Sequence, residues 1–89
     1  MGQITVTRPS QHALEELGVR NWETWTCDVS TFDWHYDQKE TCYVLEGAVT
    51  VTVGQDKVDI KAGDLAIFPA GMDCTWTVTS PIKKHYKFG

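Results

Sequence analysis

The sequence predicts an all-β fold, an antiparallel barrel or jelly roll with one short helix near its N-terminus. From Trp22 to the end, short segments alternate apolar and polar residues, and turns rich in glycine or proline separate them. Such alternation places apolar side chains on one face of each strand, and many short strands of this kind are typical of closed antiparallel sheets. A chain of 89 residues has room for a single core. We therefore expect one domain, 1–89, with its barrel at about 22–88.

The N-terminal elements have clear boundary signals. Residues 3–7 alternate and predict a strand. Ser10 is a candidate N-cap for a helix over 11–17, and Gly18 is a candidate stop, because serine caps helix starts and glycine adopts the left-handed conformation that ends helices.

The remaining segments predict strands joined by tight turns. We expect a hairpin turn at Glu46–Gly47, between the arms 40–46 and 48–53, and further turns at 54–57 and 62–64. The complete set of strands expected after the helix is 25–29, 32–36, 40–46, 48–53, 58–60, 65–68, 73–79 and 82–88.

Composition limits the classes of partner and location. The formal charge is −4, whereas nucleic-acid binding needs a concentrated basic surface. No apolar run is long enough to cross a bilayer, and the N-terminus lacks a secretory pattern. Cys27, Cys42 and Cys74 have spacings that fit neither a disulfide framework nor a zinc knuckle. We expect a cytoplasmic protein without nucleic-acid or membrane partners, and a homodimer, since small domains often gain stability from a second subunit.

Two segments resemble the signature motifs of the cupin superfamily, usually written G-x5-H-x-H-x3,4-E-x6-G and G-x5-P-x-G-x2-H-x3-N. Glu40 and Gly47 match the end of the first motif. Gly63, Pro69 and Gly71 match the second at the expected intervals. The resemblance implies the cupin (RmlC-like) barrel. It also implies the usual metal site of the superfamily, in which three histidines and the glutamate are the ligands.

The sequence departs from both motifs at the histidine positions. With three residues before Glu40, these positions hold Trp34 and Tyr36; with four, they hold Asp33 and His35. The histidine of the second motif is replaced by Cys74. A metal site would therefore have to use Glu40, Cys74 and His35, a set that suits zinc better than manganese or iron. Because His35 lies on the strand face opposite Trp34 and Tyr36, we expect no cofactor, with a divalent metal as the alternative.

The run 40–47, together with Trp76 and the Lys-Lys-His-Tyr tail, resembles one subgroup of cupins. These are small single-domain proteins grouped with ureidoglycine aminohydrolase-like and ethanolamine-utilisation-like domains, many of them uncharacterised. The resemblance implies a small-molecule ligand, of which an amide- or ureide-like metabolite is one class. It does not fix a reaction, because this fold carries many functions.

Strand alternation predicts a pocket inside the barrel that holds one carboxylate, two thiols and aromatic walls. Each residue also has a purely structural interpretation: the aromatic rings as core filling, the cysteines as small buried hydrophobic residues, and the glutamate as a buried ion pair with Lys84 or Arg20. Since carboxylates are rarely buried without a partner, we assign Glu40 a catalytic role as general acid or hydrogen-bond donor. The predicted pocket residues are Trp34, Tyr36, Cys42, Cys74 and Trp76.

Three functions follow from this pocket. The first is a small-molecule-binding cupin, the second a metal-dependent enzyme with Glu40 and Cys74 as ligands, and the third a non-catalytic dimeric module whose cavity is only core. The sequence leaves open whether the protein is an enzyme.

Overall fold

The structure, a computed structural model, describes residues 3–89. Its elements, in chain order, are β1 (Thr5–Thr7), α1 (Gln11–Leu17), the 3₁₀ turn η1 (Val19–Asn21), β2 (Glu23–Cys27), β3 (Ser30–His35), β4 (Glu40–Val53), β5 (Asp56–Lys61), β6 (Leu65–Phe68) and β7 (Asp73–Phe88).

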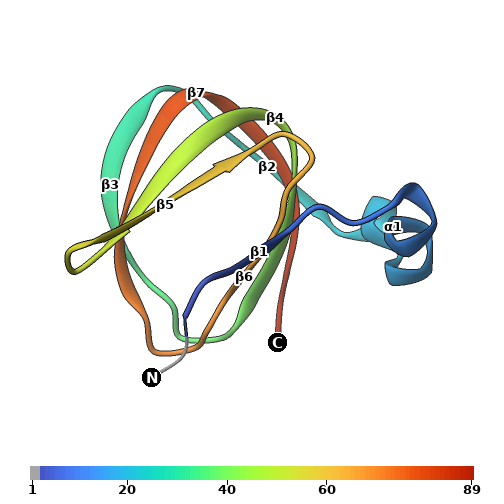
Figure 1. Cartoon of the computed structure of the whole chain (residues 1–89), viewed down its shortest axis with the longest axis horizontal. Helices are drawn as coiled ribbons and strands as arrows, with labels where there is room; N and C mark the ends of the chain where they lie inside the picture. The colour runs from blue at the N-terminus through green and yellow to red at the C-terminus, as the bar shows by residue number, and fades with distance from the viewer. Residues whose placement is uncertain (1–2) are drawn as a thin grey trace.

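The helix α1 begins and ends where the sequence predicts. Ser10 Oγ accepts a hydrogen bond from the Ala13 N–H at 3.1 Å, which caps the first turn. Gly18 adopts a left-handed conformation with φ 70° and closes the last turn. No side chain of α1 is buried, and Figure 1 shows the helix projecting from the side of the barrel. Within residues 3–89, no helix is long and apolar enough to cross a bilayer.

The strands form a rolled antiparallel sheet, the barrel seen in Figure 1. The order along the sheet is β1-β6-β4-β7-β2, with β3 also pairing with β7 and β5 also pairing with β4. The strands β4 and β7 lie at the centre of this arrangement, and each pairs with three others. The predicted all-β, antiparallel architecture with a short N-terminal helix is confirmed.

The predicted hairpin turn at Glu46–Gly47 is wrong. Residues 40–53 form one continuous strand, β4, and the predicted strands 73–79 and 82–88 likewise join into β7. Where β4 passes β7, the register shifts repeatedly between Val44 and Val49, which marks a β-bulge. Gly47 has φ 84°, a value that favours glycine in bulges as well as in turns. Pro81 in β7 lies opposite the bulge, a position in a sheet where a missing N–H is tolerated.

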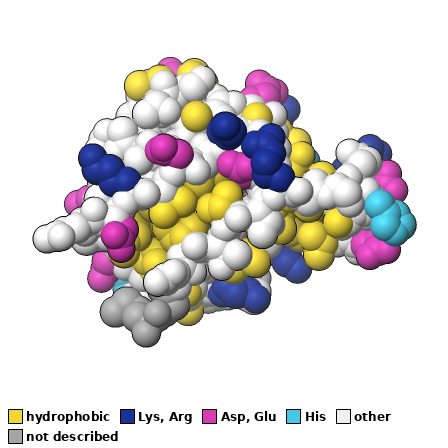
Figure 2. Space-filling view, in the orientation of Figure 1, with side chains coloured by type: hydrophobic (Ala, Val, Ile, Leu, Met, Phe, Trp, Pro, Cys, Tyr) yellow, Lys and Arg dark blue, Asp and Glu magenta, His cyan; other side chains and the backbone are white. Residues whose placement is uncertain are grey.

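The core lies between the inward faces of β4, β6 and β7. Alternate residues of β4 and β7 are buried and pack with Ile60, Phe68 and Met72 in one cluster. Figure 2 shows hydrophobic side chains in the middle of the barrel, with charged side chains spread around them. Beside this cluster, between β2, β3, β7 and the start of β4, the interior is not filled.

Candidate functional site

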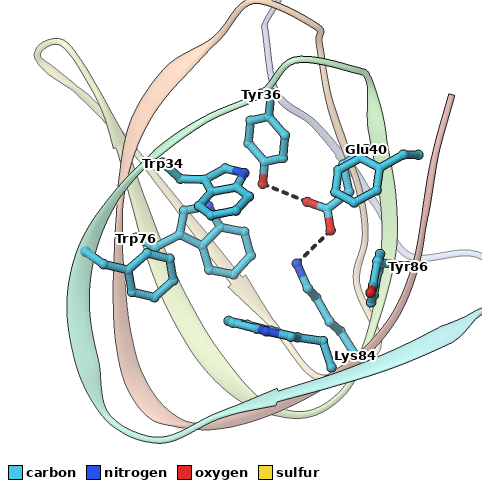
Figure 3. A pocket seen from close by; sticks show the side chains of 9 residues that line it. Trp34, Tyr36, Glu40, Trp76, Lys84 and Tyr86 are labelled. Atoms are coloured by element: carbon cyan, nitrogen blue, oxygen red, sulfur yellow. Dashed lines mark hydrogen bonds and ion pairs between the residues drawn. The ribbon is translucent and has the colours of Figure 1, made fainter.

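A cavity of about 200 Å³ lies inside the barrel between these strands, and it is partly open to solvent. Figure 3 shows its polar side chains turned toward one another in the centre, with aromatic rings around them. The residues that line it are Trp25, Phe32, Trp34, Tyr36, Glu40, Trp76, Lys84, Tyr86 and Phe88.

Glu40 is the carboxylate of this cavity, and it is buried with two partners. Tyr36 Oη donates a hydrogen bond to Oε1 at 2.7 Å, and Lys84 Nζ donates one to Oε2 at 2.7 Å. The glutamate is 2% exposed at the first position of β4. Both ends of the Tyr36 backbone are fixed, since its N–H donates to the Met72 carbonyl and its carbonyl accepts from Gly71. The fold therefore holds the phenol and the carboxylate in one geometry.

Lys84 brings a buried cation to this carboxylate. Its Nζ lies over three aromatic rings, at 4.3 Å from the Trp76 centroid, 4.9 Å from Trp25 and 5.8 Å from Tyr86. Cation–π contacts of this kind stabilise an ammonium that has lost its water. Together with Glu40, the three rings surround the ammonium on several sides.

The partnership of Glu40 with Lys84 is one of the two ion pairs that the sequence left open. The basic run at 83–87 obscured it, because such a run normally lies on the surface. Strand alternation carries the signal. Cys74, Trp76 and Ile82 are buried at even positions of β7, and Lys84 continues this series.

The walls of the cavity are a connected set of aromatic rings. Phe32 stacks on Trp76 with centroids 6.2 Å apart, and Trp25 meets both edge-on at 6.3 and 6.0 Å. Tyr36 stacks on the core residue Phe68 at 4.9 Å. Within the described residues, Trp76 Nε1 is buried without a hydrogen-bond partner, an arrangement that costs about 1–3 kcal/mol.

Of the predicted pocket residues, Tyr36, Trp76 and Glu40 line the interior of the cavity. Trp34 lies at its mouth, where 48% of the residue is exposed, and meets Tyr36 edge-on at 6.4 Å. Sequence reasoning did not assign Trp25, Phe32, Lys84, Tyr86 or Phe88 to the cavity. Four of these are aromatic. Phe32 lies on the same face of its strand as Trp34 and Tyr36, so alternation already carried its signal, whereas Trp25, Tyr86 and Phe88 come from predicted strands whose inward face was not assigned.

The two predicted cysteines do not line this cavity. Cys42 is fully buried in the core, and burial raises the pKa of its thiol from an ordinary value of 9.0 to about 12. Cys74 is also buried and lies beside a shallow surface depression near Asp33 and His35. Burial raises the pKa of Cys74, and the neighbouring Trp76 indole partly opposes that rise without reaching hydrogen-bond geometry. Both side chains are therefore protonated thiols at neutral pH, and neither is an activated nucleophile.

The residues present do not fit the metal site that cupins usually hold. Between residues 3 and 89, no three histidine, cysteine, aspartate or glutamate side chains converge. The alternative set of Glu40, Cys74 and His35 is not brought together, because His35 faces outward. Its Nδ1 lies 2.6 Å from Asp73, and its Nε2 lies 3.5 Å from Asp37. The ammonium of Lys84 occupies the side of the Glu40 carboxylate that a cation would take.

Comparison with known proteins places this architecture in a family. Residues 14–86 match the model of the EutQ-like cupin domain. A crystal structure of a DUF861 family protein from Thermotoga maritima is 44% identical, with a TM-score of 0.96, covering 98% of this chain and 100% of that one. The EutQ protein of Clostridium difficile and a putative ethanolamine utilization protein Q from Salmonella typhimurium are each 25% identical. Their TM-scores are 0.69 and 0.68; each alignment covers 73% of this chain, and 52% and 53% of theirs.

No curated protein sequence matches the chain. The family match covers most of the chain, and it agrees with the barrel and with the two motifs around Glu40 and Gly63. The chain belongs to the EutQ-like cupin family.

Proposed function

We propose that this cupin binds a small, flat, polar metabolite in the cavity beside Glu40, and that an amide- or ureide-like compound is its ligand class. The observation that carries the proposal is the cavity itself, about 200 Å³ of space with mostly aromatic walls and a few polar side chains in its centre. Concave apolar sites with a few convergent polar groups are the usual form of small-molecule sites.

The arrangement of side chains supports a division of roles. The rings of Trp34 and Trp76 offer faces and edges to the flat part of a ligand. Tyr36, Glu40 and Lys84 offer hydrogen-bonding groups to its polar part. Glu40 is held in an ion pair, so its proposed role is to position Lys84 and the ligand, in place of the general-acid role that the sequence led us to expect.

One observation favours a second candidate, a dimeric module in which the site serves stability alone. The Glu40 carboxylate already has a lysine and a tyrosine partner, as a structural ion pair would. This candidate predicts that replacing Trp34 changes nothing, because Trp34 is half-exposed at the mouth and supports little of the core. Light scattering of the purified protein measures the oligomeric state that this candidate requires.

A thermal-shift screen of small amides and ureides tests the proposal. A ligand at 100 times its dissociation constant adds about 2.7 kcal/mol to the free energy of unfolding. The Trp34→Ala variant should lose at least part of the shift, whereas Trp22→Ala should keep it, because Trp22 contacts Lys87 and does not line the cavity. No shift with any compound, or equal shifts in both variants, would overturn the proposal.

A further inference from the structure

The ammonium of Lys84 lies inside what is, chemically, a complete receptor for an ammonium ion. Three aromatic rings, Trp25, Trp76 and Tyr86, face it at 4.3–5.8 Å, and the Glu40 carboxylate contacts it at 2.7 Å. Aromatic cages of this kind recognise cationic ligands in other proteins. Here the occupant is part of the chain.

We propose that this internal ammonium sets the charge class of the ligand. The cavity selects uncharged molecules that carry both a hydrogen-bond acceptor and a hydrogen-bond donor, and it rejects small anions and cations of the same shape. This inference rests on the proposed function, since it specifies which ligands the same cavity takes.

The first support is the hydrogen-bonding capacity that the three polar side chains leave unused. An ammonium has three N–H donors, and within residues 3–89 that of Lys84 has one oxygen acceptor, Glu40. Tyr36 Oη donates to Glu40, and its oxygen can still accept a bond. A ligand that bridges these groups needs one acceptor, to receive the Lys84 N–H, and one donor, directed at Tyr36 or Glu40. A primary amide carries both groups on two atoms bonded to the same carbon.

The second support is the charge balance of the cavity. Glu40 and Lys84 neutralise each other at 2.7 Å, and both are buried. A carboxylate ligand would add a negative charge, and an amidinium ligand a positive one, in a place with little water to solvate it. A neutral amide adds no net charge, so it enters without that cost.

The third support is the fixed position of the ammonium. Lys84 lies on β7 between two neighbouring strands, opposite Trp25 of β2 and Val44 of β4. Its side chain is 7% exposed, so it cannot easily swing out to follow a ligand or leave the cage empty. The cage therefore remains closed to an external cation.

Three planar molecules of one shape test the charge rule directly: acetamide, acetate and acetamidinium. Binding is measured by NMR titration of the folded protein. We expect the wild type to bind acetamide with a dissociation constant at least about tenfold lower than that of either ion. A tenfold ratio corresponds to a difference of ~1.4 kcal/mol in binding free energy. In Glu40→Gln the preference should move to acetate, because Lys84 is then unpaired. In Lys84→Met it should move to acetamidinium.

The controls use the same types of substitution on the same two strands. Glu46 and Lys83 are exposed and lie opposite each other in β4 and β7. Glu46→Gln and Lys83→Met change the net charge equally, but they should leave the preference for acetamide unchanged. If these controls shift the preference as strongly as the cavity variants do, or if wild-type protein binds acetate or acetamidinium as tightly as acetamide, the charge rule is overturned.

A rescue experiment tests the cage without any knowledge of the natural ligand. Lys84→Ala removes three carbons and the ammonium, which together correspond to n-propylammonium. We expect n-propylammonium to raise the melting temperature of Lys84→Ala, and 1-propanol, its uncharged analogue, to have little effect. If the variant does not fold alone, refolding in the presence of each compound gives the readout. Equal effects of the two compounds, or no effect of either, would refute the cage.

The two experiments separate the two proposals. If n-propylammonium rescues Lys84→Ala but wild-type protein binds none of the three planar probes or the screened amides, then ligand binding fails and the caged ammonium stands. If acetamide binds but the ions bind equally well, the cavity is a ligand site without charge selection.

Discussion

Replacing Gly47 by alanine should destabilise the barrel far more than the same replacement at Gly71. The two glycines have nearly the same backbone conformation, φ 84° and φ 87°. An alanine in this left-handed region costs about 1–2 kcal/mol at either position. The surroundings differ. A Cβ at Gly71 meets nothing within 4 Å, whereas a Cβ at Gly47 would lie 2.0 Å from the Pro81 carbonyl oxygen and 2.8 Å from Ile82 Cα.

The additional cost at Gly47 follows from that overlap. Carbon and oxygen atoms approach to about 3.3 Å at closest, so β4 and β7 would have to separate by roughly 1.3 Å at the bulge. Breaking two or three neighbouring hydrogen bonds costs about 1 kcal/mol each. Gly47→Ala should therefore lose about 4 kcal/mol, and Gly71→Ala about 1–2 kcal/mol. A domain of this size has a free energy of unfolding of roughly 4–13 kcal/mol.

Urea unfolding, followed by tryptophan fluorescence and by circular dichroism, measures both losses. In thermal unfolding, each 1 kcal/mol corresponds to about 4–8 °C for a domain of this size. Gly71→Ala should then melt about 4–16 °C below the wild type, and Gly47→Ala at least about 16 °C below it. If the two variants lose the same free energy within about 0.5 kcal/mol, the close contact with Pro81 is not a constraint on the fold, and our description of the bulge is incorrect.

Three further predictions concern the site and the core. Glu40→Gln and Lys84→Met should each lower the free energy of unfolding by about 3–5 kcal/mol, because each leaves a buried group without its partner. In urea unfolding, the double variant should lose clearly less than the sum of the two single losses. Additive losses would argue against the ion pair. Burial raises the pKa of Cys42 to about 12, so the folded protein keeps a proton that the unfolded chain releases above pH ~9. The free energy of unfolding should be unaffected by this thiol below that pH and fall by up to ~1.4 kcal/mol per pH unit above it. If a Cys42→Ala variant lost stability with pH as steeply as the wild type, this explanation would be contradicted. Trp76→Ala should lower the free energy of unfolding by about 3–5 kcal/mol, because Trp76 is buried, and Trp34→Ala by less than about 1 kcal/mol, because Trp34 is half-exposed. Equal losses would show that Trp34 belongs to the core.

The fold could be predicted from the sequence because its local signals agree with one another. Ser10 and Gly18 set the ends of α1 through a hydrogen bond and a left-handed conformation, both of which depend on the local chain alone. The Gly63–Phe68 segment likewise gives a turn followed by a strand with the predicted bounds. The error at Gly47 has a physical reason. A glycine with positive φ occurs in hairpin turns and in bulges alike, and only pairing with the distant Pro81 segment distinguishes them.

The site could be predicted only in part. Alternation around Glu40 placed Tyr36 and Trp76 in the interior, but it gave no information on which strands meet around the carboxylate. Cys42 has the inward parity and is fully buried, but it packs in the core cluster and does not line the cavity. Lys84 reaches the cavity through long-range strand pairing, since its partner Glu40 lies 44 residues away in the sequence. A charged residue that continues a series of alternating buried residues is itself a signal of burial, even inside a basic run.

The bulged strands β4 and β7 have a further consequence for how the molecule opens. Glu40–Tyr43 of β4 pairs with β6 and Ala48–Val53 with β5, while β7 accompanies β4 past both segments. The segment of β4 that carries Glu40 is therefore continuous with the segment that pairs with β5, and β7 pairs with both. Amide hydrogens along both segments should exchange with solvent as one cooperative unit. A metabolite bound beside Glu40 would then slow amide hydrogen exchange as far away as Val53. Binding in the cavity could therefore be detected at residues that do not contact the ligand.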